Sequence, residues 1–463
     1  MSTIVQENTR IIPNRQTSLT KEQKKAVGLL SIGTFLEYFD LMLYIHMAAF
    51  LNELFFELTD PHATSLMMAF AYCSTFIFRP VGAVIFGWLG DTIGRKSTVI
   101  ITTFMMAVSC LVMANLPTYA QIGVTAAWIV TICRAAQGIS SMGEVIGADL
   151  YLTETIKPPA QYASVVLIGA FGGLGEIGAL GIASLVTLHG FNWRLAFWVG
   201  AAIALVGSVA RTTLRETPEF ADANRQIKKV FEKANIDTAS LTNHPILQEK
   251  VNKKTLIAFF LLQCAFPICF YFTYIYCGNI LKTNFGYTMA EVIHHNFMVC
   301  LMELSITLIL CYLSLKIYPL LIMKIILIIS SIFIIFCPYL LNNINSPYQL
   351  FFIQFCMLLW KKCLSPSLPI CYKSFPVFKR FTCVSMTFAV SRALMTVITS
   401  FGFVYLTEHF GHWGLWVVII PIIIGFAYGF FHFEKLVKEY GDLPIAFRDT
   451  ATYSEKNNYS SQL

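Results

Sequence analysis

The feature that most constrains this chain is a succession of long apolar segments. Six precede a polar stretch of about forty residues, and six follow it. A segment of about 20 apolar residues crosses a bilayer as a helix, because inside lipid each backbone group needs a partner within its own segment. The predicted spans are residues 26–51, 63–89, 98–115, 122–150, 163–188, 193–214, 255–281, 289–313, 320–341, 348–372, 382–406 and 413–433.

The composition favours a membrane protein. The chain of 463 residues is 56% hydrophobic and only 13% charged, whereas soluble domains average about 25% charged residues. Residues 1–25 are polar, so we expect the first apolar segment to be retained as a span and not removed as a signal peptide. The net charge is +7, but the basic residues lie between the spans and form no single patch, so we expect no nucleic-acid partner.

The loops between the spans are alternately basic and nearly free of Lys and Arg. Since cytoplasmic loops of membrane proteins carry the excess of Lys and Arg, both termini and the central linker should be cytoplasmic. We therefore expect an all-α membrane protein with twelve transmembrane helices in two six-helix bundles and a site between them near mid-membrane. The predicted division is 1–25 (tail), 26–214 (first bundle), 215–254 (linker), 255–433 (second bundle) and 434–463 (tail).

The loop between the second and third spans reads GWLGDTIGRK at residues 87–96. Its glycines allow a tight turn between closely packed helices. Asp91 can accept hydrogen bonds from backbone N–H groups at a helix start, and Arg95 and Lys96 can pair with it. This loop resembles the G-x-L-x-D-x-x-G-R-K signature of the major facilitator superfamily. The resemblance implies a gating loop, whose expected residues are Gly87, Gly90, Asp91, Gly94, Arg95 and Lys96.

Further motifs resemble those of the metabolite:proton symporter family, and in particular the proline/betaine transporters. They are GTFLEYFD (33–40), RAAQG (134–138), GEVIGA (143–148), RETPEF (215–220) and FPVFKR (375–380). The likeness is dense over residues 26–220 and sparse afterwards, and the sequence SLKIYP at 314–319 lacks the Asp and Gly that a second copy of the loop signature would carry. The resemblance implies a multi-pass protein of the bacterial inner membrane that works by alternating access.

Charged residues inside the apolar spans are the candidate functional groups, because each costs about 2.5–3.5 kcal/mol at mid-bilayer unless it faces a cavity or a partner. A symporter needs a carboxyl group that is neutral in one conformation and ionised in another. The proton-coupling candidates are Glu37, Asp40, Glu144 and Glu176. The substrate-binding candidates are Arg134, Gln137, Arg79, Lys361 and Arg392. The alternative for the charges of the first, second and fourth spans is a permanent ion pair that only fixes helix positions, and Glu176 could equally have a structural role. For Lys361 and Arg392 the alternative is that the second half has drifted from the family pattern.

We therefore expect a monomeric secondary transporter in a lipid bilayer that takes up a small polar solute together with protons. The solute remains open between zwitterions, such as proline or betaine, and organic acids. The proton gradient replaces any cofactor, and no metal site, catalytic group or enzymatic activity is expected. The altered loop at 314–319 motivates an alternative, a transport-dead receptor or sensor with the same fold.

Overall fold

A computed structural model describes residues 16–56, 61–189, 192–222, 225 and 250–440 of the chain. The first half contains six long helices, one for each predicted span, and a single-turn helix α4 (Tyr119–Ile122). The long helices are α1 (Lys21–Phe55), α2 (Pro61–Thr92), α3 (Arg95–Asn115), α5 (Val124–Thr155), α6 (Ala160–His189) and α7 (Arg194–Arg211).

The second half also contains six spans, of which three are interrupted. The seventh consists of α9 (Lys253–Gln263), α10 (Ala265–Phe270), a π-helical turn (Tyr271–Tyr276) and α11 (Cys277–Phe285). The eighth and ninth are α12 (Met289–Lys316) and α13 (Pro319–Asn342). The last three are α14 (Pro347–Lys362) with α15 (Leu368–Lys373), α16 (Val377–Val397) with a π-helical turn (Ile398–Phe403) and α17 (Val404–Phe410), and α18 (Leu415–Tyr440).

Prolines accompany two of these interruptions. Proline has no N–H group and its ring crowds the preceding turn, so it breaks the helical hydrogen-bond ladder. Pro267 follows the break between α9 and α10, and Pro366 lies in the break between α14 and α15. As a result α14 ends at Lys362, which places Lys361 and Lys362 in its last turn.

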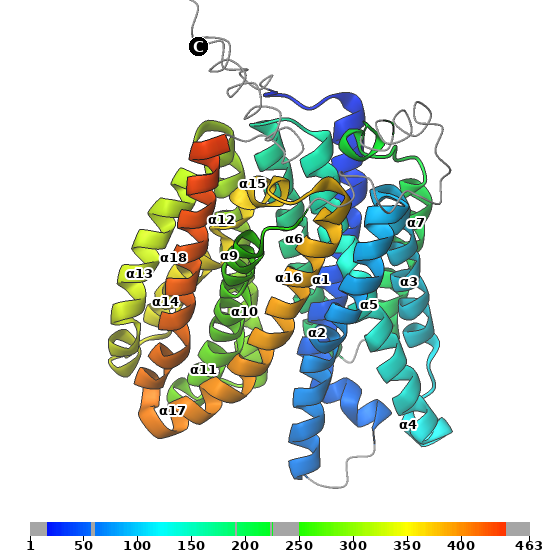
Figure 1. Cartoon of the computed structure of the whole chain (residues 1–463). Coiled ribbons are helices and arrows are strands. Elements are labelled where there is room, and N and C mark those ends of the chain that lie inside the picture. The colour runs from blue at the N-terminus through cyan, green and yellow to red at the C-terminus, as the bar shows by residue number, and fades with distance from the viewer. Residues whose placement is uncertain (1–15, 57–60, 190–191, 223–224, 226–249, 441–463) are drawn as a thin grey trace, which may run out of the picture.

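The two halves meet along a seam formed by two helix pairs (Figure 1). Helix α2 packs along α16, and α6 packs along α12. One hydrophobic core runs through both halves. The end of the molecule at which α1 begins and α18 ends, which we call the basic end, carries residues such as Lys21, Lys96 and Lys379. Among the described residues, the Lys and Arg at the opposite end are Arg194 and Lys282.

The outer surface is apolar where a bilayer would surround it. Helix α13, for example, exposes Ile328, Ile332 and Phe336. Eight stretches of the described residues are long and apolar enough to cross a membrane, and one of these stretches holds both the eleventh and twelfth spans. This architecture confirms the predicted all-α membrane fold.

The domain boundaries stay a prediction. Helix α1 begins at Lys21, ahead of the predicted start at residue 26, and α18 ends at Tyr440, beyond the predicted end at residue 433. Most of both tails and most of the linker lie outside the described residues.

Candidate functional site

Two separate buried ion pairs lie within the first half. In one, Arg79 Nη2 of α2 lies 2.5 Å from Glu37 Oε1 of α1. In the other, Arg134 Nη1 of α5 lies 3.0 Å from Asp40 Oδ2 of α1. Glu37 and Asp40 are three residues apart and share one face of α1. Each nevertheless binds a different neighbouring helix, so the two acids join α1 to α2 and to α5.

Arg134 is surrounded by polar partners within the first half. Its guanidinium also donates to Gln137 Oε1 at 2.9 Å and to Thr75 Oγ1 at 2.6 Å, and it lies 4.1 Å above the Tyr44 ring centroid. Gln137 in turn donates to Asp40 Oδ1 at 2.8 Å. Neither Arg134 nor Gln137 lines the cavities described below. Their contacts correspond to the structural alternative, in which paired charges fix helix positions.

Glu144 lies in a third buried pair, with a different arginine. Its Oε2 is 2.7 Å from Arg211 Nη1 of α7, and its Oε1 accepts from Thr102 at 3.2 Å and from Thr103. Arg211 also donates to two backbone carbonyls of α1. The pair sits directly against Gly33 of α1, where a Cβ atom would overlap both charged groups. Glycine at this position therefore allows the pair to form beside α1.

A cavity of about 90 Å³, which we call the seam cavity, lies between the two halves. Its lining comes from α1, α5 and α6 on one side and from α9, α10, α14, α15, α16 and α18 on the other. Its polar residues are Thr34, Tyr38, Asp149, Glu176, Gln263, Lys361, Lys362, Ser365, Tyr372 and Arg392. Both halves therefore contribute ionisable groups to one cavity.

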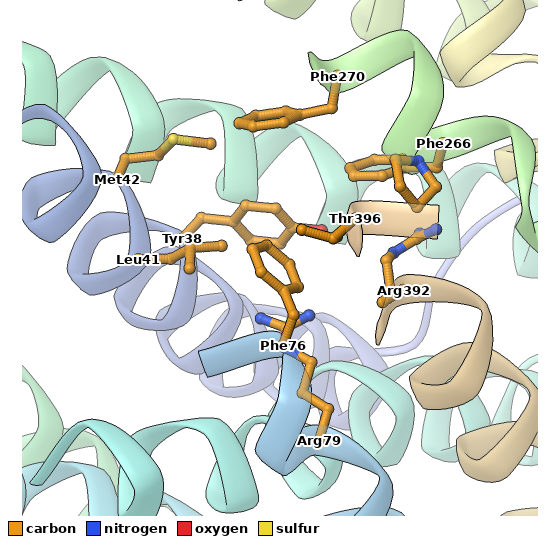
Figure 2. A pocket seen from close by; sticks show the side chains of 10 residues that line it. Tyr38, Leu41, Met42, Phe76, Arg79, Phe266, Phe270, Arg392 and Thr396 are labelled. Carbon is orange, nitrogen blue, oxygen red and sulfur yellow. The ribbon is translucent and has the colours of Figure 1, made fainter. Parts of the chain in front are cut away.

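A smaller cavity of about 20 Å³ adjoins it, since Tyr38 and Arg392 line both. Figure 2 shows Tyr38 and Arg392 reaching it from α1 and α16, with Phe76 and Phe266 close by. Arg79 also lines this cavity, although its guanidinium is paired with Glu37.

A carboxylate bound by two lysines borders the seam cavity. Lys361 Nζ lies 2.7 and 2.8 Å from the two carboxylate oxygens of Glu303 in α12, and Lys362 Nζ lies 2.9 Å from Oε1. The Tyr274 hydroxyl donates to Glu303 Oε2 at 2.6 Å. We call Lys361 and Lys362 the lysine pair. Since one carboxylate serves two ammonium groups, the cluster retains one positive charge.

Arg392 is a buried cation without a carboxylate partner among the described residues. Its Nη1 donates to the carbonyl oxygen of Gln263 at 2.9 Å, and its guanidinium lies 4.0 Å from the Phe266 ring centroid. Pro267 lies four residues after Gln263 and has no N–H, so it leaves this carbonyl without its helical donor. The broken seventh span thus supplies the acceptor that positions Arg392.

Glu176 of α6 faces the seam cavity from the first half. Its Oε2 atom is buried and has no hydrogen-bond partner among the described residues. Most other buried carboxyl groups of the candidate site are bound by a guanidinium or by the lysine pair. Asp149 also lines the cavity without an ion pair, but it accepts from the Tyr372 hydroxyl at 3.0 Å. Among the described residues, Glu176, Asp149 and Arg392 are therefore the ionic groups of the seam cavity that lack an oppositely charged partner in contact.

The predicted gating loop joins the halves at the basic end. Asp91 Oδ1 accepts from the backbone N–H of Phe381 at 3.0 Å, and Oδ2 accepts from that of Thr382 at 2.8 Å. These groups are the fifth and sixth residues of α16, in its second turn. Arg95 Nη2 donates to the Val377 carbonyl at 2.8 Å. The loop therefore binds the other half of the molecule as well as its own turn.

Glu154 of α5 extends this contact. It lies 3.0 Å from Arg95 Nη2 and 2.9 Å from Arg380 Nη1 of α16, and Arg380 also pairs with Glu219 at 2.7 Å. We call Asp91, Arg95, Glu154, Glu219 and Arg380 the basic-end lock. The Arg95–Glu154 pair lies within the first half, whereas the Arg380 pairs and the Asp91 contacts reach α16 of the second half. These contacts with α16 close the seam at the basic end.

The structure gives a reason for each of the three loop glycines but does not show the pairing expected of Lys96. Gly94 has φ +106°, a conformation that favours glycine. A Cβ atom at Gly87 would lie 2.8 Å from the Thr382 Cα atom, and one at Gly90 would overlap the Phe381 ring, so both allow α2 to approach α16. The predicted pairing of the Lys96 ammonium with Asp91 is wrong. The backbone N–H of Lys96 donates to Glu216 at 3.3 Å instead.

The structure sorts the candidate residues into three places. Glu176, Lys361 and Arg392 meet in the seam cavity. Glu37, Asp40, Arg79, Arg134 and Gln137 form the two pairs around α1, and Glu144 lies apart with Arg211. The sequence analysis missed Glu303, Glu154 and Arg211. Each is a charge at or inside an apolar span, so the cost of burying charge would have identified them.

The chain resembles known transporters in sequence and in structure. An inner membrane metabolite transport protein of Escherichia coli (strain K12) is 33% identical over 225 residues, or 46% of this chain and 50% of the relative. A proline/betaine transporter of Salmonella typhimurium is 31% identical over 205 residues, or 42% of this chain and 41% of the relative. The chain thus spans about half the length of the curated relatives it matches.

Among solved structures, a proton:xylose symporter matches with a TM-score of 0.69 and 15% identity, over 92% of this chain and 98% of that one. A human organic anion transporter matches with a TM-score of 0.64 and 14% identity, over 90% and 100% of the two chains. At these identities the likeness establishes the fold alone. The family model of the Major Facilitator Superfamily matches residues 30–393, most of the chain. The chain belongs to the major facilitator superfamily.

Proposed function

We propose that this protein takes up a small polar solute together with protons by alternating access across the bacterial inner membrane. The observation that carries the proposal is the seam cavity, where Glu176 of the first half faces Lys361, Lys362 and Arg392 of the second. In two-bundle transporters the halves rock about a central site, so groups contributed by both halves change their contacts during the cycle. The cavity has room only for a small solute.

The basic end is the cytoplasmic end in this proposal. Its Lys and Arg residues follow the positive-inside bias. The basic-end lock then closes the cytoplasmic side of the seam, and transport requires that it open. The contacts of Asp91 and Arg95 with α16 and the Glu154–Arg380 pair are the interactions that would break.

Glu176 is the proposed proton site. It can take up and release a proton without first breaking an ion pair, whereas Glu37, Asp40 and Glu144 are each bound by an arginine. Because Glu176 lies between the two halves, its surroundings change as the halves move. If Glu176 does not carry the proton, the paired acids Glu37, Asp40 and Glu144 are the next candidates. Substituting each acid in turn and measuring proton-driven uptake tests this ranking.

Uptake by purified protein in liposomes tests the proposed function. Radiolabelled L-proline, glycine betaine, pyruvate and succinate are added outside under an inward proton gradient, with protein-free liposomes as the control. We expect at least one solute to accumulate and a proton ionophore to abolish the accumulation. Accumulation that is indifferent to the ionophore would contradict proton coupling.

A transport-dead receptor of the same fold is the second candidate. The observation that favours it is the asymmetry of the two halves, since α12 ends at Lys316 and is followed by Ile317, with no acidic residue to bind the facing half as Asp91 does. A receptor would bind one of the four solutes without moving it. Binding without uptake or exchange in the same liposomes would favour this candidate over transport.

A further inference from the structure

Arg392 and the lysine pair distinguish between the two solute classes that the sequence leaves open. We infer that the solute is an organic anion whose carboxylate binds Arg392 beside the lysine pair, and that it is not a zwitterion that also carries an ammonium group, such as proline or betaine. The inference rests on the proposed function and names the substrate class of the same cavity.

The guanidinium of Arg392 has no carboxylate partner among the described residues. A buried charge is costly unless it is paired, and Arg392 has one carbonyl oxygen and two phenylalanine rings as its contacts among the described residues. A guanidinium presents a fixed fork of donors that matches a carboxylate in two parallel hydrogen bonds. Since Arg392 lines both cavities, a solute carboxylate can reach the donors that the Gln263 carbonyl leaves open.

The numbers of cations and carboxylates at the seam cavity also favour an anionic solute. With all groups ionised, three cations meet three carboxylates, namely Lys361, Lys362 and Arg392 against Glu176, Glu303 and Asp149. A proton on Glu176 leaves one positive charge in excess, and one carboxylate of the solute cancels it. Binding of a proton and of an anion therefore support each other, which is the coupling that a symporter requires.

The aromatic rings of the two cavities disfavour a solute with an ammonium group. Quaternary ammonium groups are recognised by cages of aromatic faces. Several rings of these cavities already carry a resident cation. Arg392 lies over Phe266 and Phe388, at 4.0 and 4.4 Å, and Lys361 lies over Phe266 and Phe270, at 4.8 and 5.1 Å. The resident cations take the place that an ammonium head group would occupy and repel it.

Calorimetric titration of the purified full-length protein with four probes tests this inference. The probes are pyruvate, succinate, L-proline and glycine betaine, and the variants are Arg392→Lys and Arg392→Gln. We expect pyruvate or succinate to bind, and both variants to weaken that binding roughly 10- to 100-fold, because each loses charge-assisted hydrogen bonds. Lys282→Gln, which removes an exposed cation at the opposite end, should leave the affinity unchanged.

The selectivity of the unmodified protein is itself a test, so the inference stays falsifiable if a variant fails to fold. Binding of glycine betaine or L-proline in preference to both acids would overturn it, and so would normal affinity in Arg392→Lys. Proton-driven uptake of betaine would overturn the anion inference and leave the transport function standing. Binding of the acids without any uptake would support the site and contradict transport.

Discussion

Six arginines are buried among the described residues, and five of them lie within about 3 Å of a carboxylate. These five hold helices together. Removing one partner of a buried pair leaves a lone charge, at a cost of about 3–5 kcal/mol, whereas replacing both partners is often nearly neutral. Arg392, the sixth, differs from the others because its partner is a carbonyl oxygen, and this difference is the basis for proposing it as a binding group.

The Arg134–Asp40 pair provides a test of the scaffold role. Arg134→Gln should destabilise the protein by about 3–5 kcal/mol because Asp40 stays buried without its cation. The double variant Arg134→Gln, Asp40→Asn should regain most of that stability. Thermal unfolding in detergent, followed by fluorescence-detected size exclusion, measures both. A double variant no more stable than the single one would contradict a scaffold role for the pair.

Gly33 provides a second test at a single residue. A Cβ atom there overlaps the Glu144–Arg211 pair, so Gly33→Ala should cost about 1–3 kcal/mol through overpacking. Gly28→Ala on the same helix is the matched control, since nothing lies within 4 Å of its Cβ position. The control should be neutral or slightly stabilising, because alanine favours helix more than glycine does. Equal unfolding temperatures for the two variants would show that the close approach is unimportant.

At the scale of elements, the start of α16 depends on a residue of the other half. Asp91 accepts from two backbone N–H groups in its second turn, and two such hydrogen bonds contribute about 1–2 kcal/mol in total. Asp91→Ala should therefore shift the seam towards opening at the basic end by roughly 5- to 30-fold. Cys383 of α16 is half-buried beside this contact and serves as a native reporter. Its alkylation, measured peptide by peptide with mass spectrometry, should accelerate by a similar factor.

Thr92→Ala is the matched control for Asp91→Ala. Thr92 is exposed, and its hydroxyl bonds to carbonyls of its own helix, so it adds nothing to the contact with α16. Its removal should leave the alkylation rate of Cys383 unchanged. If both variants react at the rate of the unmodified protein, Asp91 does not hold the seam closed.

The helices were predictable from the sequence and their interruptions were not. Twelve apolar segments of sufficient length fix the number of spans, because lipid leaves the backbone no other arrangement. The π-helical turns at Tyr271–Tyr276 and Ile398–Phe403 have no such signal, since they depend on packing between neighbouring helices. Pro366 indicates the break after Lys362, but a count of apolar residues does not register it.

At the scale of the whole molecule, the partners of the charged residues were the least predictable feature. Glu303 and Lys361 are fifty-eight positions apart and belong to different helices, so no local spacing connects them. The cost of burying charge selects which residues matter, and tertiary packing decides which of them meet. For this reason the sequence indicated both Arg134 and Arg392 as substrate-binding candidates, although of the two only Arg392 lines the seam cavity.

The Glu176→Gln variant tests whether Glu176 couples proton movement to solute movement. The amide cannot carry the proton, so the variant should lose accumulation driven by the proton gradient and keep solute exchange across the liposome membrane. Counterflow and gradient-driven uptake measured on the same liposomes compare the two activities. Glu439→Gln, at an exposed site near the end of α18, is the control and should retain both. Gradient-driven accumulation by Glu176→Gln would assign the proton to another carboxyl group.

The most direct test of proton-coupled transport follows the pH inside the liposomes. The protein is reconstituted with a trapped pH indicator, and pyruvate, succinate, L-proline or glycine betaine is added outside at equal pH, with protein-free liposomes measuring passive leakage. The account predicts that the lumen acidifies beyond the leak when an acid is added, and that Glu176→Gln abolishes this excess. Solute entry measured in parallel without any excess acidification would contradict it.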